Sequence, residues 1–236
     1  MLIHKDFICE FYFIRHGESV SNTSPGFASG IDYNSPLTPK GFDQARLLGQ
    51  RLKRENVEFD RIYSSSLVRT VQTTETMLEA MDQRGRSFTK VDALIEQQLP
   101  GWRGVRKEEV YTPEMVTYIR GKRSHFVPPQ GESQRMVQRR MANWLEDEII
   151  YNKNLVEKEV ALTVAIISHG AATKCLFHYI MGFDEGLIPR IGTDNCCISR
   201  FAFNKEGWFL ICLNDSSHIS LDDRISALHL PPPQNP

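Results

Sequence analysis

The sequence lacks an apolar run long enough to cross a bilayer. Its longest run, near residues 160–167, is far shorter than the roughly 20 residues that a membrane helix needs. The chain also lacks an excess of either charge, since 28 Lys and Arg residues face 29 Asp and Glu residues and leave a net charge of −1. We therefore expect neither a membrane nor a nucleic acid as a partner.

Cysteine motifs and targeting signals are missing as well. Near its start the sequence has no separate apolar core with a small-residue cleavage site, so we expect no secretory signal. The cysteines form no Cys-x-x-Cys pair and no Cys/His cluster with zinc spacing, and their number is odd. Buried, reduced thiols and a cytoplasmic location fit this pattern best. The five cysteines are Cys9, Cys175, Cys196, Cys197 and Cys212.

The composition that remains is that of an ordinary globular protein, with 41% hydrophobic and 24% charged residues in a chain of 236. No internal repeat or break in composition divides it. We predict a single domain over residues 1–225, with an insertion at 97–130 that forms a cap over the sheet edge. The proline-rich end, residues 226–236, is expected to be a flexible tail. The oligomeric state has no signal in the sequence.

Apolar stretches bounded by polar or glycine-containing turns predict the strands of a sheet, at 7–14, 59–63, 91–95 and 160–167. Between and after them, apolar residues at helical spacing predict helices, and residues 196–213 predict a hairpin. The helices are expected at 39–56, 67–82, after Pro113, 131–149 and 171–182, and residues 151–159 are expected to form a loop.

Chemically capable residues stand at or just past the end of each predicted strand. Arg15 and His16 follow the first strand, Arg69 follows the second, Glu96 the third and His169 the fourth. Because ligands in open α/β sheets bind at the carboxyl ends of the strands, a mostly parallel sheet brings these residues to one rim. Taken one at a time, they also fit a surface arginine, a structural histidine or a solvated carboxylate. The prediction therefore depends on their joint placement.

This set of side chains suits a phosphate monoester. Arginine presents a planar fork that matches phosphate oxygens, and two arginines with a donating histidine can stabilise a phosphoryl group in transfer. The nearby positive charge disfavours protonation of His16, which keeps a ring nitrogen free to attack phosphorus. Glu96 can protonate the leaving oxygen. We expect no metal and no other cofactor, because the arginines supply the charge that a metal would bring.

Six landmarks, taken in order, resemble the histidine phosphatase superfamily, also called the phosphoglycerate mutase-like family. The resemblance covers most of the chain, from Phe7 to about His218. The landmarks are Arg15-His16-Gly17-Glu18 with Asn22, Leu37-Thr38-Pro39-Lys40-Gly41 through Gln44-Ala45, Ser64 to Thr70 with Gln72-Thr73, Glu96 with Gly101-Trp102-Arg103-Gly104, Gly131-Glu132-Ser133 and Ser168-His169-Gly170.

The resemblance implies a fold and a mechanism. The fold would be a three-layer α/β/α sandwich whose mostly parallel sheet has one antiparallel strand. His16 would take the phosphoryl group as phosphohistidine, and Glu96 would protonate the leaving group and then activate water. The implied substrate-binding residues are Arg15, Asn22, Arg69, His169 and Gly170.

The loop around the predicted acid favours a phosphatase over a mutase. Mutases of the family resemble Glu-Arg-His-Tyr-Gly there, whereas this chain has Glu96-Gln97-Gln98-Leu99. Mutases also have a Trp-Asn pair where this chain has Val20-Ser21-Asn22. We predict metal-independent hydrolysis of small phosphomonoesters. The alternatives are a mutase-type phosphotransferase, a protein phosphatase acting on phosphotyrosine, and a catalytically silent module that binds phosphate or another protein.

The predicted cap and the helix that follows it suggest a substrate class. Between residues 97 and 140, nine basic residues outnumber four acidic ones, and aromatic residues are interleaved with them. One hypothesis is a cap that prefers multiply charged phosphates such as sugar bisphosphates or nucleotides; the alternative is an ordinary solvated face. The basic residues are Arg103, Arg106, Lys107, Arg120, Lys122, Arg123, Arg135, Arg139 and Arg140, and the aromatic ones are Trp102, Tyr111, Tyr118 and Phe126.

Overall fold

A mixed β-sheet forms the centre of the protein in the computed structural model, which describes residues 4–23, 26–28, 35–157 and 161–224. The predicted tail at 226–236 lies outside these residues. The strands are β1 (Ile8–Arg15), β2 (Arg61–Ser65), β3 (Thr89–Val91), β4 (Ala161–Ser168), β5 (Ile198–Asn204) and β6 (Gly207–Asp215).

The strand order is β3-β2-β4-β1-β5-β6. The pairings of β1 with β4, β2 with β4 and β2 with β3 are parallel, whereas β5 is antiparallel to both β1 and β6. β5 therefore runs opposite to the other strands. This confirms the prediction of a mostly parallel sheet with one antiparallel strand.

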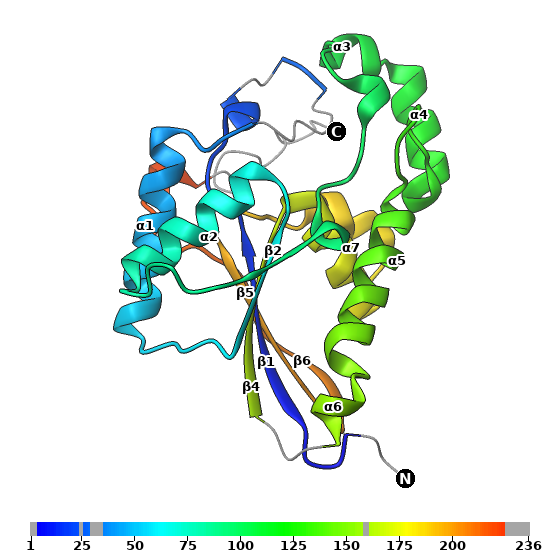
Figure 1. The fold of residues 1–236 in the computed structure, drawn as a ribbon. Helices are drawn as coiled ribbons and strands as arrows, with labels where there is room; N and C mark the ends of the chain where they lie inside the picture. The colour runs from blue at the N-terminus through cyan, green and yellow to red at the C-terminus, as the bar shows by residue number, and fades with distance from the viewer. Residues whose placement is uncertain (1–3, 24–25, 29–34, 158–160, 225–236) are drawn as a thin grey trace.

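Helices cover both faces of the sheet (Figure 1), which completes the predicted three-layer α/β/α sandwich. α1 and α2 lie on one face, and α5 and α7 lie on the other. The α-helices are α1 (Pro39–Arg54), α2 (Val68–Ala80), α3 (Lys107–Val110), α4 (Pro113–Lys122), α5 (Gln134–Leu145), α6 (Lys153–Val156) and α7 (Gly170–Met181). Short 3-10 turns are η1 (Val20–Thr23), η2 (Asp92–Leu94), η3 (Pro100–Trp102), η4 (Arg123–His125), η6 (Glu185–Arg190) and η7 (Leu221–Asp223), and η5 (Glu146–Ile150) is a π-helical turn.

The alternation of side chains along β1 builds the two cores. Phe11 and Phe13 are buried in the core that α5 and α7 cover, and Tyr12 and Ile14 are buried in the core beneath α1 and α2. Successive side chains of a strand point to opposite faces. A strand covered on both faces therefore reads as a continuous apolar run, which explains the aromatic stretch in the sequence.

The capping contacts at the helix ends use residues of the types that the sequence led us to expect there. The Thr38 hydroxyl caps α1 by accepting a hydrogen bond from the Gly41 amide at 3.0 Å, and Pro39 occupies the first helical position. Ser133 caps α5 in the same way, through the Met136 amide. Gly182 ends α7 with a φ of 63°, a left-handed conformation that glycine adopts at low cost.

Two predictions of local structure are wrong. The third strand does not cover 91–95, because β3 ends at Val91 and η2 then turns the chain. Leu94 is buried in this turn, where its carbonyl accepts the Ser168 hydroxyl. The predicted loop at 151–159 contains α6, whose first turn is capped by the Asn152 side chain. A helix of four residues shows too little of a periodic pattern to be found in a sequence.

The cysteines have no disulfide partners, and all but the half-buried Cys212 are buried. Burial raises the pKa of the Cys175 and Cys197 thiols to about 12. A cytoplasmic location stays a prediction. Among the described residues, no helix has the length and apolar character that crossing a membrane requires.

The contact between α1 and α2 yields a prediction about stability. A Cβ atom at Gly49 would lie 2.3 Å from the Met77 carbonyl oxygen and 2.7 Å from the Ala80 Cβ. Gly49→Ala must therefore push α1 and α2 apart, and we expect a loss of about 1–3 kcal/mol in the free energy of unfolding. Urea denaturation measures it.

The control for this substitution is Gly121→Ala in α4, where a Cβ atom meets open space. Alanine is the better helix former, so this variant should be neutral or gain up to about 1 kcal/mol. Equal urea midpoints for Gly49→Ala and the unmodified protein would contradict the close packing of α1 on α2.

Candidate active site

The ends of two neighbouring strands bring two histidines together. β1 and β4 pair in parallel with Arg15 opposite Ser168, so the residues that follow them, His16 and His169, leave the sheet side by side. Their ring centroids lie 5.0 Å apart, and both side chains are buried.

Arg69 reaches the same place from the first turn of α2. Its side chain is buried, with 5% of the residue exposed. Its Nε donates a hydrogen bond to Nε2 of His16 at 3.3 Å. The Thr73 hydroxyl, one turn further along α2, accepts the Gly17 amide at 3.0 Å. Two contacts therefore dock α2 onto the Arg-His-Gly turn, and the predicted meeting of Arg69 with His16 is observed.

The hydrogen bonds of His16 determine its tautomer. Its Nδ1 lies 2.7 Å from the Gly17 carbonyl oxygen, which can only accept, so Nδ1 carries the proton. Its Nε2 faces the Arg69 Nε–H, which can only donate, so Nε2 presents a lone pair. The neutral imidazole is thus held with Nε2 as its basic nitrogen.

The pKa of His16 is lowered well below its usual value of 6.5. Burial is the largest cause, and the guanidinium groups of Arg69 and Arg15 follow. The sequence predicted that nearby positive charges lower the pKa of His16. The larger effect, that of burial, could be seen only in the fold. His16 therefore stays neutral at neutral pH.

His169 is neutral for the same reasons, since burial first and the charge of Arg69 second lower its pKa well below 6.5. Its Nε2 lies 2.8 Å from the Ser65 hydroxyl oxygen at the end of β2. That hydroxyl also accepts the Leu67 amide at 3.3 Å. Ser65 can therefore donate its proton to Nε2, in which case Nδ1 of His169 carries the ring hydrogen.

Arg15 is held from the side of β5. Its Nη1 donates a hydrogen bond to the Thr193 carbonyl oxygen at 2.5 Å. Burial lowers the pKa of the guanidinium, but an arginine stays charged at any ordinary pH. A Cβ atom at Gly170 would lie 3.3 Å from the Arg15 Nε. Gly170 therefore contributes by having no side chain, which leaves room for the guanidinium.

Two buried side-chain polar atoms within the described part of the chain lack a hydrogen-bond partner, and both belong to this cluster. They are Nε of Arg15 and Nδ1 of His169. A buried polar atom without a partner costs about 1–3 kcal/mol. Such a cost at two atoms beside His16 marks the place where an anionic ligand with acceptor oxygens would be held.

Glu96 lies at the start of α7 instead of in direct contact with His16. Its carboxylate accepts hydrogen bonds from the amides of Ala172 at 2.8 Å, Ala171 at 3.2 Å and its own neighbour Gln97 at 2.8 Å. A helix N-terminus attracts a carboxylate through its free amides and its dipole. Since α7 begins directly after His169, Glu96 stands at the same rim as the histidines.

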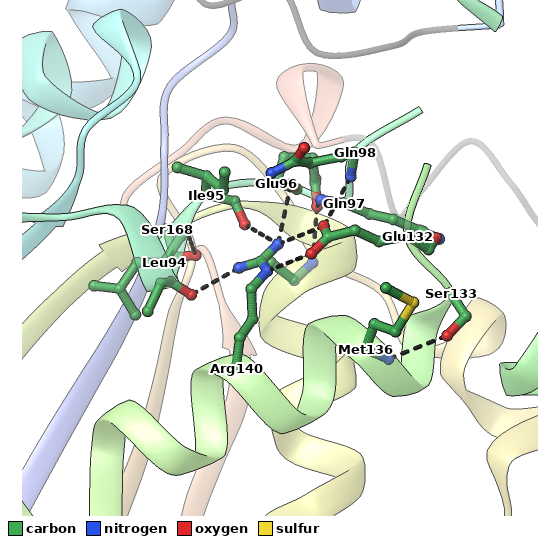
Figure 2. A network of polar contacts seen from close by, with 12 residues as sticks. Leu94, Ile95, Glu96, Gln97, Gln98, Glu132, Ser133, Met136, Arg140 and Ser168 are labelled. Atoms are coloured by element: carbon green, nitrogen blue, oxygen red, sulfur yellow. Dashed lines mark hydrogen bonds and ion pairs between the residues drawn. The ribbon is translucent and has the colours of Figure 1, made fainter. Parts of the chain in front are cut away.

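An ion pair that sequence reasoning missed holds the loop around Glu96 (Figure 2). The Arg140 guanidinium donates to the carbonyl oxygens of Ala93 at 2.7 Å, Ile95 at 2.8 Å and Glu96 at 3.1 Å. It also pairs with the Glu132 carboxylate at 2.9 and 3.0 Å. One cation on α5 thus binds three backbone carbonyl oxygens between residues 93 and 96.

Glu132 joins the same loop from the other side. Its carboxylate accepts the Gln98 amide at 3.1 Å, its own amide donates to the Gln98 carbonyl at 2.9 Å, and its carbonyl accepts the Gln97 side chain at 2.7 Å. The Glu132–Arg140 pair therefore ties the acid loop to the end of the segment 97–130. The Gly131-Glu132-Ser133 landmark marked this segment in the sequence, but it did not indicate that Glu132 would hold the acid loop.

Asn22 in η1 borders the site. Its side-chain oxygen accepts hydrogen bonds from the Ser19 amide and hydroxyl, both at 3.1 Å, and from Asn195 at 3.4 Å. Asn195 also donates to the His16 carbonyl at 3.0 Å. The amide of Asn22 is thereby oriented so that its NH2 group is available as a donor. Asn195, buried before β5, is a second residue that the sequence did not single out.

Lys174 adds a further cation on α7, one turn after His169. Burial is the largest cause lowering its ammonium pKa, and the nearby Glu96 carboxylate opposes this shift. No group of three or more His, Cys, Asp or Glu side chains arranged to hold a metal ion occurs among the described residues. The positive charges that act on both histidines are those of Arg69 and Arg15.

Other proteins resemble this chain in sequence or in fold. A probable phosphoglycerate mutase, GpmB, of Yersinia pestis is 28% identical over 223 residues, which cover 90% of this chain and 95% of that protein. A mutant phosphoserine phosphatase from Entamoeba histolytica in complex with phosphoserine has 23% identity and a TM-score of 0.74, covering 90% of this chain and 100% of the other. The α-ribazole phosphatase of Shigella flexneri has 22% identity and a TM-score of 0.72, covering 88% and 96%.

The sequence profile of the histidine phosphatase superfamily (branch 1) matches residues 11–216. This match spans both histidines, both arginines and Glu96. The chain therefore belongs to the histidine phosphatase superfamily.

Proposed function

We propose that the chain is a metal-independent phosphatase that hydrolyses small phosphomonoesters through a phosphohistidine intermediate on His16. The observation that carries the proposal is the arrangement around Nε2 of His16. That nitrogen carries the basic lone pair of the ring, which accepts the Arg69 Nε–H, and the two unpartnered buried atoms, Arg15 Nε and His169 Nδ1, belong to the same cluster.

In the first step, the Arg69 Nε–H exchanges Nε2 of His16 for a phosphoryl oxygen. Nε2 then attacks phosphorus while the bond from phosphorus to the leaving oxygen breaks. Arg15, Arg69 and His169 donate to the phosphoryl oxygens and stabilise their charge during transfer. The Asn22 amide supplies one more donor. Glu96, in its acid form, gives the leaving oxygen a proton, and the alcohol departs.

In the second step, Glu96 acts as a base. It removes a proton from water, the water oxygen bonds to phosphorus, and the bond from phosphorus to Nε2 breaks. Phosphate leaves, His16 is again neutral, and Glu96 again carries a proton.

Hydrolysis is favoured over mutase activity by the acid loop. Gln97 and Gln98 occupy the positions where mutases carry an arginine and a histidine. The Gln97 side chain donates to the Glu132 carbonyl, and the Gln98 backbone amide donates to the Glu132 carboxylate. Mutase activity is the second candidate, because the similar Yersinia pestis protein is described as a probable phosphoglycerate mutase. An assay of phosphoglycerate interconversion against phosphate release separates the two activities.

The phosphohistidine is tested by trapping. When the protein is mixed with 4-nitrophenyl phosphate and quenched with base, we expect phosphate on His16, located by mass spectrometry. His16→Ala should lose the adduct and about a thousandfold or more of the activity. The control is His125→Ala, an exposed histidine in η4. An adduct on another residue, or full activity of His16→Ala, would refute the mechanism.

The depressed pKa of His16 gives a prediction about pH. By NMR we expect its ring to stay neutral well below pH 6.5 in the folded protein, and to titrate near 6.5 in urea. Arg69→Met removes the second cause and should raise the pKa toward its usual value while leaving the effect of burial. A ring that titrates at 6.5 in the folded protein would contradict the burial of His16.

The same shift affects stability. Below pH 6.5 the unfolded chain binds a proton at this histidine and the folded chain does not. The free energy of unfolding should therefore fall as the pH drops from about 6.5 toward the pKa of the folded state. Urea midpoints of the unmodified protein at several pH values measure this effect.

Arg140 is proposed as the residue that positions Glu96. Removing it in Arg140→Met frees three loop carbonyls, so we expect kcat to fall about tenfold or more with a smaller change in KM. The loss should be larger for an alkyl phosphate than for 4-nitrophenyl phosphate, because nitrophenolate leaves with little need of a proton. Glu96→Gln should show the same dependence on the leaving group.

The matched control is Arg139→Met, which alters an exposed arginine at the preceding position of α5. Arg140→Lys keeps the charge but not the fork and should recover only part of the activity. Equal losses with both leaving groups would assign Arg140 a purely structural role.

A further inference from the structure

A cavity of about 890 Å³ lies between the segment 97–130 and η6, outside the His16 cluster. We call this segment the cap and the cavity the cap cavity. We propose that the cap cavity receives the leaving group of the substrate, and that this substrate is a phosphomonoester whose apolar or aromatic body carries a second anionic group. The inference rests on the proposed phosphatase function and adds the substrate class.

One wall of the cap cavity is aromatic. Trp102 and Phe126 stack at 5.8 Å between ring centroids, and Tyr111 meets Trp102 edge-on at 5.6 Å. Leu99 and Ile119 line the cavity beside them. Cavities of roughly 300–1,000 Å³ with apolar walls and few polar groups are typical sites for small organic ligands. This wall favours a carbon body over a bare phosphate or a small sugar.

Two arginines add a charge requirement. Arg120 on α4 and Arg190 at the end of η6 line the cavity, and both are exposed. Neither guanidinium has a hydrogen-bond or carboxylate partner in the part of the chain that the structure describes. Arg123 differs, because it pairs with Asp184 at 3.4 Å and Glu185 at 3.7 Å. The guanidinium groups of Arg120 and Arg190 can therefore bind an anion through their paired N–H donors.

The two carboxylates on the cavity wall, Asp184 and Glu185, share one cation, Arg123. Glu185 also accepts the Ser124 hydroxyl and amide, so the contacts of Arg123 and Ser124 fasten the cap to η6. The same contacts hold the two cavity walls together. A pocket with fixed walls loses less free energy on binding than one that must be ordered first.

The cap cavity begins beside the proposed proton donor. Gln97 lines it, and the Gln97 amide donates to the Glu96 carboxylate at 2.8 Å. The oxygen that Glu96 protonates belongs to the leaving group. A leaving group released at Glu96 therefore has the cap cavity as its adjoining space, whereas the phosphoryl group stays at His16.

The structure also narrows the hypothesis of a basic cap. Of the basic residues counted in the sequence, only Arg120 and Arg123 line the cavity, and Arg140 is engaged with the acid loop. Lys122 lies outside the lining, with its ammonium 5.7 Å from the Tyr118 ring centroid. Arg120 and Lys122 thus form a matched pair on one helix, inside and outside the cavity.

The experiment compares naphthyl phosphate with the same ester bearing a carboxylate on the far ring. Arg120→Gln should lower kcat/KM at least tenfold for the carboxylated ester and less than twofold for the parent, and Arg190→Gln should do the same. Lys122→Gln should change neither. Circular dichroism and urea midpoints establish that each variant is folded.

Equal effects of Arg120→Gln and Lys122→Gln, or equal effects on both esters, would overturn the inference and leave the phosphatase function standing. If the unmodified protein hydrolyses neither these esters nor 4-nitrophenyl phosphate, the proposed function fails instead. Calorimetry of the carboxylated ester, carried out in the His16→Ala background, then decides the inference. Binding must be lost in the His16→Ala/Arg120→Gln double variant and kept in His16→Ala/Lys122→Gln.

Discussion

The structure of the site depends on a guanidinium buried against a neutral imidazole. Arg69 and His16 meet at 3.3 Å with almost no exposure to solvent. Burying a guanidinium costs free energy, and Arg69 is held in place because α2 is docked through Gly17 and Thr73 and His16 follows β1 beside β4. The fold thereby maintains a positive, desolvated cradle in which the imidazole keeps its lone pair. Phosphate oxygens are the natural complement of that cradle.

Around this pair, the beginning of α7 and one ion pair organise the remaining groups. α7 starts directly after His169 and holds the Glu96 carboxylate with its free amides. Arg140 fixes the loop that carries Glu96 and shares Glu132 with the end of the cap (Figure 2). The acid loop and the cap therefore form one connected unit. In Figure 1, α3 and α4 stand at the same end of the molecule as the carboxyl ends of β1 and β4.

The sequence predicted most of the fold because its signals are local. The apolar run of β1, the Thr38-Pro39 start of α1 and the Gly182 end of α7 each lie within a few neighbouring residues. The errors arose where a local pattern is ambiguous. Residues 91–95 look like a strand, yet Leu94 and Ile95 are buried in a turn, because their carbonyls bind Ser168 and Arg140.

The sequence by itself determined which side chains reach the rim, because the carboxyl ends of parallel strands meet there and Arg15, His16, Arg69 and His169 follow such ends. Only the tertiary structure decided the tautomer of His16, the dominant effect of burial on its pKa, and the neighbours of Glu96. It alone joined Arg140 to the Ala93 carbonyl 47 residues away, and Arg120 to Arg190 across one cavity. Contacts between distant segments depend on packing, and packing leaves no periodic or local mark in a single sequence.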